Sequence, residues 1–170
     1  RGLGDVYKRQ LLDLLTIKER KGSFEGLKVA IIGDLLHSRV AKSNIWGLTK
    51  LGTEVCVSGP PTLLLPGIEK FGVQVHYDVR EAVNQADVIL TTRMRMEAQD
   101  KTFLPSLDEY KRFFRIDHNL LRYAKEDAIV MHPGPIQRGI EISDGVIDSP
   151  QCIINDQIAN SVAVRMAMFY

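Results

Sequence analysis

The sequence predicts a doubly wound α/β fold, with a mostly parallel five-stranded sheet and helices on both of its faces. Short apolar runs rich in Val and Ile recur along the chain without polar alternation, as expected of strands buried on both faces of a parallel sheet. Helical patterns separate these runs, and such alternation builds a parallel sheet through right-handed crossovers. The length of 170 residues suits one domain of this Rossmann-like class.

The first predicted element is an amphipathic helix over 11–21. Its apolar residues recur at spacings of three and four, which predicts that Leu11, Leu14, Leu15 and Lys18 share one face. A strand over 28–33 (KVAIIG) follows it. It carries no alternation and therefore belongs in the middle of the sheet.

The remaining elements follow from the same two patterns. Further strands are expected at 54–57, 73–77, 87–91 and 128–131. Further helices are expected at 38–51, 66–71, 80–86, 107–114, 119–124 and 153–170. Residues 58–61 (SGPP) must form a loop, because Gly and the two prolines interrupt regular structure.

Composition excludes several classes of protein. Hydrophobic residues make up 45% and charged residues 25% of the chain, which is typical of a globular protein and not of a disordered one. With 22 basic and 21 acidic residues the formal net charge is +1, so bulk charge favours neither nucleic-acid nor membrane-surface binding. No apolar run approaches the ~20 residues of a membrane-spanning helix. We expect a cytoplasmic protein without nucleic-acid or membrane partners.

The sequence predicts neither a cofactor nor a metal site. Cys56 and Cys152 lie in separate apolar runs and are expected to be buried thiols. His37, His76 and His118 are scattered and are expected to be surface or capping residues. The turn after the first strand (GDLLHS) has one glycine where a dinucleotide fingerprint requires three.

Two arginines follow predicted strands at their carboxyl ends, where ligands of open α/β sheets bind. Arg39 comes after the first strand and Arg93 after the fourth. If these strands are neighbours, the two guanidinium groups face one crevice and can clamp carboxylates or a phosphate. The alternative is that both are surface residues paired with local acids such as Asp34 and Glu97.

The fifth strand ends in His132-Pro133-Gly134-Pro135. The two prolines remove two amide donors, so the carbonyl groups of this turn are left to face a ligand rich in donors, such as a terminal NH2. X-Pro bonds in tight turns are also the usual place for cis peptides. The alternative is a plain turn that ends the strand.

Four segments carry a resemblance to a known family. They read LKVAIIGDLLHSRVAKSNIWGLTKLG, DVILTTRMRME, AIVMHPGPIQRGIEI and QIANSVAVRMA. From residue 11 to 170 the chain resembles the aspartate-binding, C-terminal domain of bacterial aspartate carbamoyltransferases. The resemblance implies that Arg39 and Arg93 bind the two carboxylates of L-aspartate, and that the backbone at Gly134 and Pro135 binds the carbamoyl group of carbamoyl phosphate. It also implies a cis peptide between Gly134 and Pro135.

The resemblance implies a transferase of pyrimidine biosynthesis, in which the aspartate amine attacks carbamoyl phosphate and phosphate leaves. Catalytic chains of the family form homotrimers, with regulatory chains in some cases. The carbamoyl-phosphate domain of the family has no counterpart here, so we expect an aspartate site without catalytic residues or cofactor. Residues 1–10 (RGLGDVYKRQ) do not match the family and are interpreted as an artefactual leader, and Arg95 replaces the family's glutamine.

Two other functions compete with this one. Ornithine carbamoyltransferases share the fold but carry H-C-L-P at the position of residues 132–135, and two clamp arginines would repel ornithine. A non-catalytic α/β binding module is the other alternative. If a second domain belongs here, the terminal helices should expose apolar residues to solvent. Those expected are Leu12, Leu15, Val164, Met168 and Phe169.

Overall fold

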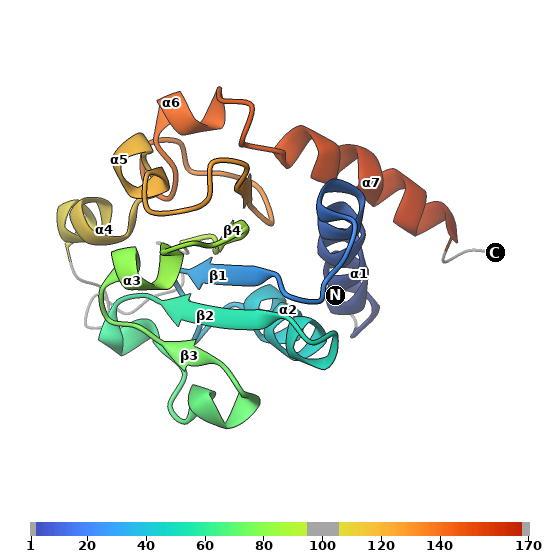
Figure 1. Cartoon of the computed structure of the whole chain (residues 1–170), viewed down its shortest axis with the longest axis horizontal. Helices are drawn as coiled ribbons and strands as arrows, with labels where there is room; N and C mark the ends of the chain where they lie inside the picture. The colour runs from blue at the N-terminus through green and yellow to red at the C-terminus, as the bar shows by residue number, and fades with distance from the viewer. Residues whose placement is uncertain (1–2, 95–105, 168–170) are drawn as a thin grey trace.

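The computed structural model describes residues 3–94 and 106–167. Five parallel strands form one sheet in the order β3-β2-β1-β4-β5 (Figure 1). This confirms the predicted fold class, with every strand pairing of the described sheet parallel. The strands are β1 (Lys28–Ile32), β2 (Glu54–Ser58), β3 (Gln74–Val75), β4 (Val88–Thr91) and β5 (Ile129–Met131).

Helices cover both faces of the sheet. The α-helices are α1 (Leu3–Lys21), α2 (Arg39–Lys50), α3 (Val79–Val83), α4 (Leu107–Phe114), α5 (His118–Leu121), α6 (Asp144–Ile147) and α7 (Ile154–Ala167). Two 3-10 turns, η1 (Pro61–Leu63) and η2 (Ile68–Phe71), lie between β2 and β3. Helix α1 packs against both α2 and α7, so the first and last helices of the chain lie against each other (Figure 1).

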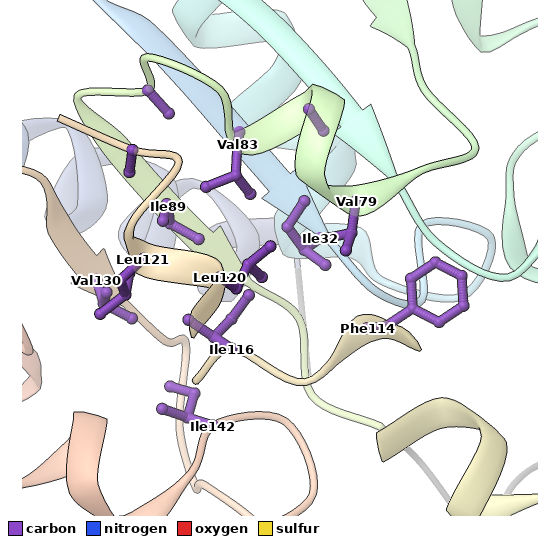
Figure 2. Close-up of a cluster of buried hydrophobic side chains, with 14 of the residues drawn as sticks. Ile32, Val79, Val83, Ile89, Phe114, Ile116, Leu120, Leu121, Val130 and Ile142 are labelled. Atoms are coloured by element: carbon purple, nitrogen blue, oxygen red, sulfur yellow. The ribbon is translucent and has the colours of Figure 1, made fainter. Parts of the chain in front are cut away.

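Alternate residues of β1 serve two hydrophobic cores. Ala30 and Ile32 join the cluster beneath α3, α4 and α5, which Figure 2 shows around Ile116 and Leu120. Val29 and Ile31 join the opposite cluster beneath α1 and α2. A strand apolar on both faces, with no polar alternation, is what this position requires.

Some predicted boundaries are wrong. Strand β3 has only two residues, Gln74–Val75, where a strand over 73–77 was expected. The helix expected at 66–71 is a 3-10 turn over Ile68–Phe71, flanked by two glycines in the left-handed conformation. Helix α6 was not predicted, because its four residues are too few to show a period.

The face of α1 with Leu11, Leu14, Leu15 and Lys18 is not the face that is most deeply buried. Leu11 is 48% exposed, Leu14 and Leu15 are half-buried, and Lys18 is exposed. The buried positions of α1 are instead mostly polar, because they meet polar partners on α2 and α7. They are Gln10, Asp13, Thr16 and Ile17.

No structural boundary follows residue 10. Helix α1 begins at Leu3 and runs through to Lys21, so residues 3–10 form part of the same helix as residues 11–21. Gln10 is buried, and Arg9 donates a hydrogen bond to the carbonyl oxygen of Pro133 at 3.1 Å. The foreign origin of residues 1–10 stays a prediction.

The outer faces of the terminal helices are apolar, as expected, but at other positions. Leu12, Leu15 and Val164 are half-buried, while Met168 and Phe169 lie outside the described residues. On α7 the exposed apolar residues are four apart and form one stripe. They are Ile158 (61% exposed), Val162 (57%) and Met166 (60%).

The carboxyl edge of the sheet is tightly closed around β1. Gly33 has φ +119°, and a Cβ atom there would lie 2.4 Å from Thr92 Oγ1. A Cβ atom on Gly59 would lie 2.2 Å from the carbonyl oxygen of Gly33. Only glycine fits at either position. The segments that leave β1, β2 and β4 therefore start from closely fixed points.

Candidate functional site

The four predicted site residues lie at one edge of the sheet. Arg39, Arg93 and the turn with Gly134 and Pro135 follow β1, β4 and β5, which are adjacent parallel strands. The register pairs Ile32 with Thr91 and Leu90 with Met131, so the three strands end level with one another. The clamp was predicted on the condition that the strands before Arg39 and Arg93 are neighbours, and β1 and β4 are neighbours in the sheet. Whether both guanidinium groups reach one ligand stays a prediction.

The two arginines differ in setting. Arg39 is the exposed first residue of α2, whose N-cap Ser38 accepts a hydrogen bond from Ala41 N–H. Arg93 is half-buried, and its Nε atom is buried without a hydrogen-bond partner among the described residues. No ion pair within residues 3–94 and 106–167 uses either arginine.

The alternative interpretation pairs Arg39 and Arg93 with the nearby acids Asp34 and Glu97, of which the structure describes only Asp34. Asp34 is buried and faces His37, whose Nδ1 lies 3.1 Å from its carboxyl oxygens. Glu97 and the substituted position Arg95 lie outside the described residues. The buried Nε of Arg93 is the feature of this pair that best fits an incoming anion, since a buried donor without an acceptor is costly.

The turn after β5 has the predicted cis peptide between Gly134 and Pro135. Gly134 has φ +65°, and its N–H donates to His132 Nδ1 at 2.8 Å. A Cβ atom at Gly134 would meet nothing within 4 Å, so the turn faces open space. The hydrogen bonds of the described residues leave the carbonyl oxygens of Gly134 and Pro135 uncommitted. The turn thus offers acceptors, as predicted.

The ring of His132 is hydrogen-bonded to the turn that follows it. Its Nδ1 accepts from Gly134 N–H, so in the neutral ring the proton sits on Nε2. That Nε2 lies 3.4 Å from Glu141 Oε2, and both side chains are fully buried. Glu141 also accepts from Met94 N–H and Gln137 N–H, each at 2.8 Å. Glu141 therefore ties the segment after β4 to the segment after the turn.

A buried polar cluster lies on the other side of the turn. Asp13 on α1 accepts from Asn44 Nδ2 on α2 at 2.6 Å and from Gln157 Nε2 on α7 at 2.9 Å. Gln157 Oε1 in turn accepts from His132 N–H at 3.0 Å. Burial raises the pKa of Asp13 to about 6, against the two amide donors and the nearby charge of Arg9, which lower it.

This raised pKa makes the stability of the fold depend on pH. The folded state binds a proton at Asp13 more tightly than the unfolded chain, so the stabilisation is full below pH 3.8 and is lost as the pH rises through about 6. With each pKa unit worth ~1.4 kcal/mol, acidification from about pH 7 to about pH 4 should raise the Asp13 contribution to the free energy of unfolding by roughly 2 kcal/mol. Urea titrations of the wild type and Asp13→Asn should diverge by this amount. A pH-independent difference between them would contradict the assignment.

The surface of the described residues has at least two pockets. One of about 460 Å³ lies between the turn, α1 and α7. Gly134 and Pro135 line it together with basic residues from separate elements, namely Lys8, Arg9, Arg138 and Arg165. The other, of about 900 Å³, lies beyond β2 and β3 against α4 and α5, and none of the predicted site residues lines it.

Sequence reasoning missed Asp13, Gln157, His132 and Glu141 as supports of the turn. The one usable signal was on α1, where Gln10, Asp13 and Ile17 recur at helical spacing, but leucines at neighbouring positions gave a more apolar face. Glu141 lies in an irregular segment that no periodicity could place. Polar contacts between elements distant in sequence leave no local pattern.

The two cysteines and the other three histidines lie outside the four predicted site residues. Cys56 is buried and Cys152 half-buried, and burial raises the pKa of both thiols. His37 and His118 are exposed and His76 is half-buried. Within the described residues, no group of three or more His, Cys, Asp or Glu side chains could hold a metal ion. In the same ranges, no helix is both long and apolar enough to span a bilayer.

Comparison with protein families identifies residues 25–170 as an aspartate/ornithine carbamoyltransferase Asp/Orn binding domain. The aspartate carbamoyltransferase catalytic subunit of Ruminiclostridium cellulolyticum is 55% identical over 169 residues, which are 99% of this chain and 54% of that protein. The corresponding subunit of Acetivibrio thermocellus is 54% identical over the same shares. The chain thus spans about half the length of the curated relatives that it matches.

Solved structures show the same fold at lower identity. Ornithine carbamoyltransferase from Pyrococcus furiosus matches with a TM-score of 0.80 and 31% identity, over 95% of this chain and 54% of that one. The enzyme from Gloeobacter violaceus matches with a TM-score of 0.78 and 30% identity, over 95% and 56% of the two chains. The arrangement of strands and helices in this chain is thus the same as in about half of each of these enzymes.

Proposed function

Since the chain belongs to the aspartate/ornithine carbamoyltransferase family, we propose that it is the aspartate-binding part of an aspartate carbamoyltransferase. The observation that carries this proposal is the identity of about 55% with aspartate carbamoyltransferase catalytic subunits over nearly the whole chain. Identity to the ornithine enzymes is 31% and 30%. The substrates are then L-aspartate and carbamoyl phosphate, and the product belongs to pyrimidine biosynthesis.

The site chemistry supports a dicarboxylate in preference to ornithine. Arg39 and Arg93 follow adjacent strands and are both always charged, so each can pair with one carboxylate in a bidentate manner. The ammonium group on the side chain of ornithine would meet the same charge and be repelled. The carbonyl oxygens of Gly134 and Pro135 would accept hydrogen bonds from the terminal NH2 of carbamoyl phosphate.

In the proposed reaction a bond forms between the aspartate amine nitrogen and the carbonyl carbon of carbamoyl phosphate. The bond from that carbon to the phosphate oxygen breaks, the amine loses a proton, and phosphate leaves with the electron pair. The described residues would orient both reactants, and such orientation supplies a large part of the rate in reactions between two substrates. None of them is assigned a proton-transfer role.

The proposal extends to the assembly and its place in the cell. The apolar stripe on α7 (Ile158, Val162 and Met166) is a surface that the rest of the relatives' length would cover, since exposed apolar patches mark interaction sites. We propose a cytoplasmic enzyme whose complete catalytic chains form homotrimers, with or without regulatory chains.

Succinate titration of the 170-residue chain tests the dicarboxylate site. Two charge-assisted pairs of roughly 1.5–3 kcal/mol each should give binding of about millimolar strength at best once the entropy of association is subtracted. Arg93→Ala should weaken this binding roughly 10- to 100-fold. Amide chemical shifts near Arg39 and Arg93 report it.

The matched control is Arg122→Ala, which removes an exposed arginine at the end of α5. It should leave succinate binding unchanged. Ornithine in place of succinate should produce no shifts. Shifts with ornithine alone would favour the ornithine enzymes, and shifts with neither ligand would favour the non-catalytic binding module.

A further inference from the structure

We propose that the buried pair Asp13–Gln157 positions the ligand-binding turn, by fixing the backbone N–H of His132 from which the turn starts. The pair joins α1 to α7 through a hydrogen bond of 2.9 Å and reaches His132 N–H through a second one of 3.0 Å. Asp13 and Gln157 are 2% and 4% exposed. The proposal deepens the proposed function, because it assigns positioning residues to the turn that would receive the carbamoyl group.

The carboxylate at position 13 decides which way the Gln157 amide faces. A carboxylate only accepts hydrogen bonds, so the neighbouring amides must present their NH2 groups to it. Asn44 Nδ2 and Gln157 Nε2 both do so. Gln157 Oε1 is therefore left on the opposite side, where it accepts from His132 N–H. A reversed amide would place an NH2 group against that N–H, with no acceptor between them.

The orientation of His132 passes directly to the turn. His132 follows β5 without a break, and its Nδ1 accepts from Gly134 N–H at 2.8 Å. The carbonyl oxygen of Pro133 accepts from Arg9, which lies on the same helix as Asp13. Three successive residues of the turn are thus held by hydrogen bonds, two of them from outside the turn. The free carbonyl oxygens of Gly134 and Pro135 follow next in the chain and take their direction from this frame.

Exchanging the carboxylate at position 13 and the amide at position 157 tests this chain of hydrogen bonds from Asp13 through Gln157 to His132 N–H. Asp13→Asn keeps the shape but puts an NH2 group where Gln157 donates, so the amide of Gln157 must turn or lose its partner. Adding Gln157→Glu restores all three contacts. The new amide at position 13 would donate to the new carboxylate at position 157, and that carboxylate would accept from His132 N–H. Asn44 would keep an acceptor in the amide oxygen at position 13. The buried charge of the pair is the same as in the wild type.

We expect the amide resonance of Gly134 to shift in Asp13→Asn and to move back toward its wild-type position in the double variant. The resonance of His132 is not used for this comparison, because its acceptor changes from an amide oxygen to a carboxylate oxygen. The matched control is Asn160→Ala. It removes a different α1–α7 contact, the bonds from Asn160 to Thr16 and Glu19, which do not reach the turn. This variant should leave the Gly134 resonance in place even if it lowers stability. An unshifted Gly134 resonance in Asp13→Asn, or one that does not move back in the double variant, would overturn the proposal.

A pH titration of the wild-type chain, followed by NMR, tests the same proposal without any variant that could fail to fold. The titration of Asp13 should move the amide resonances of His132 and Gly134 with the same midpoint as its own carboxyl carbon. The charged or titratable groups that face Asp13 are Arg9 on α1 and His132 after β5, while α2 and α7 present the neutral Asn44 and Gln157. Different midpoints for Asp13 and for these amide resonances would overturn the proposal. This experiment uses no ligand, so its failure would leave the proposed dicarboxylate site standing.

Discussion

Replacing Glu141 by alanine is expected to lower the free energy of unfolding by about 2–6 kcal/mol, because two N–H groups lose their acceptor at roughly 1–3 kcal/mol each. These donors are the backbone groups of Met94 and Gln137, and Glu141 itself is fully buried. The total stability of a domain is about 5–15 kcal/mol, so this is a large fraction of it. Urea unfolding monitored by circular dichroism measures the loss.

The conservative variant and a surface control sharpen the measurement. Glu141→Gln keeps one acceptor oxygen and should lose about half as much stability as Glu141→Ala. Glu126→Ala removes an exposed glutamate and should be nearly neutral, as most surface changes are. Glu141 also joins the segment next to Arg93 to the segment after the turn, so Glu141→Gln should weaken succinate binding as well. Equal stabilities for the alanine variants at 141 and 126 would contradict this role.

The sequence was sufficient for the sheet and for placing the four predicted site residues at its carboxyl edge. Buried parallel strands are apolar on both faces, and that local property marks β1, β2, β4 and β5 wherever they lie in the order. The rule that ligands bind at the carboxyl edge then selected Arg39, Arg93 and the turn at 132–135 without any knowledge of strand order. The cis peptide between Gly134 and Pro135 was implied by the family resemblance, while the residues alone showed only that an X-Pro bond in a turn is the usual place for one.

The supports of the turn could not be predicted, for a physical reason. Asp13 and Gln157 are 144 positions apart, and each is polar on a helix whose apolar residues dominate the periodicity. A buried polar group is tolerated only because a partner from another element satisfies it, and that partner is known only once the elements are packed. The same effect misled the assignment of α1, whose buried face is defined by Asp13 and Thr16 and not by Leu11.

The 170-residue chain is expected to form no measurable carbamoyl-aspartate from carbamoyl phosphate and L-aspartate. Acyl-transfer chemistry needs hydrogen-bond donors placed where negative charge develops, and the loss of one such donor typically lowers the rate ~100- to 1000-fold. The described turn offers acceptors, the carbonyl oxygens of Gly134 and Pro135, and not donors of this kind. The chain also spans only 54% of the length of its relative from Ruminiclostridium cellulolyticum.

A chimera decides whether this chain supplies the aspartate half of the reaction. The part of the Ruminiclostridium cellulolyticum subunit that this chain does not match is joined ahead of the 170-residue chain, and product formation is compared with that of the 170-residue chain alone. The chimera should be active, and Arg93→Ala should raise its KM for aspartate far more than its KM for carbamoyl phosphate, because the two ligands would contact different elements. Arg122→Ala should change neither constant. Product formed by the 170-residue chain alone would contradict the division into two parts. An inactive chimera that still binds succinate would show that the described site recognises a dicarboxylate but does not present it for carbamoyl transfer.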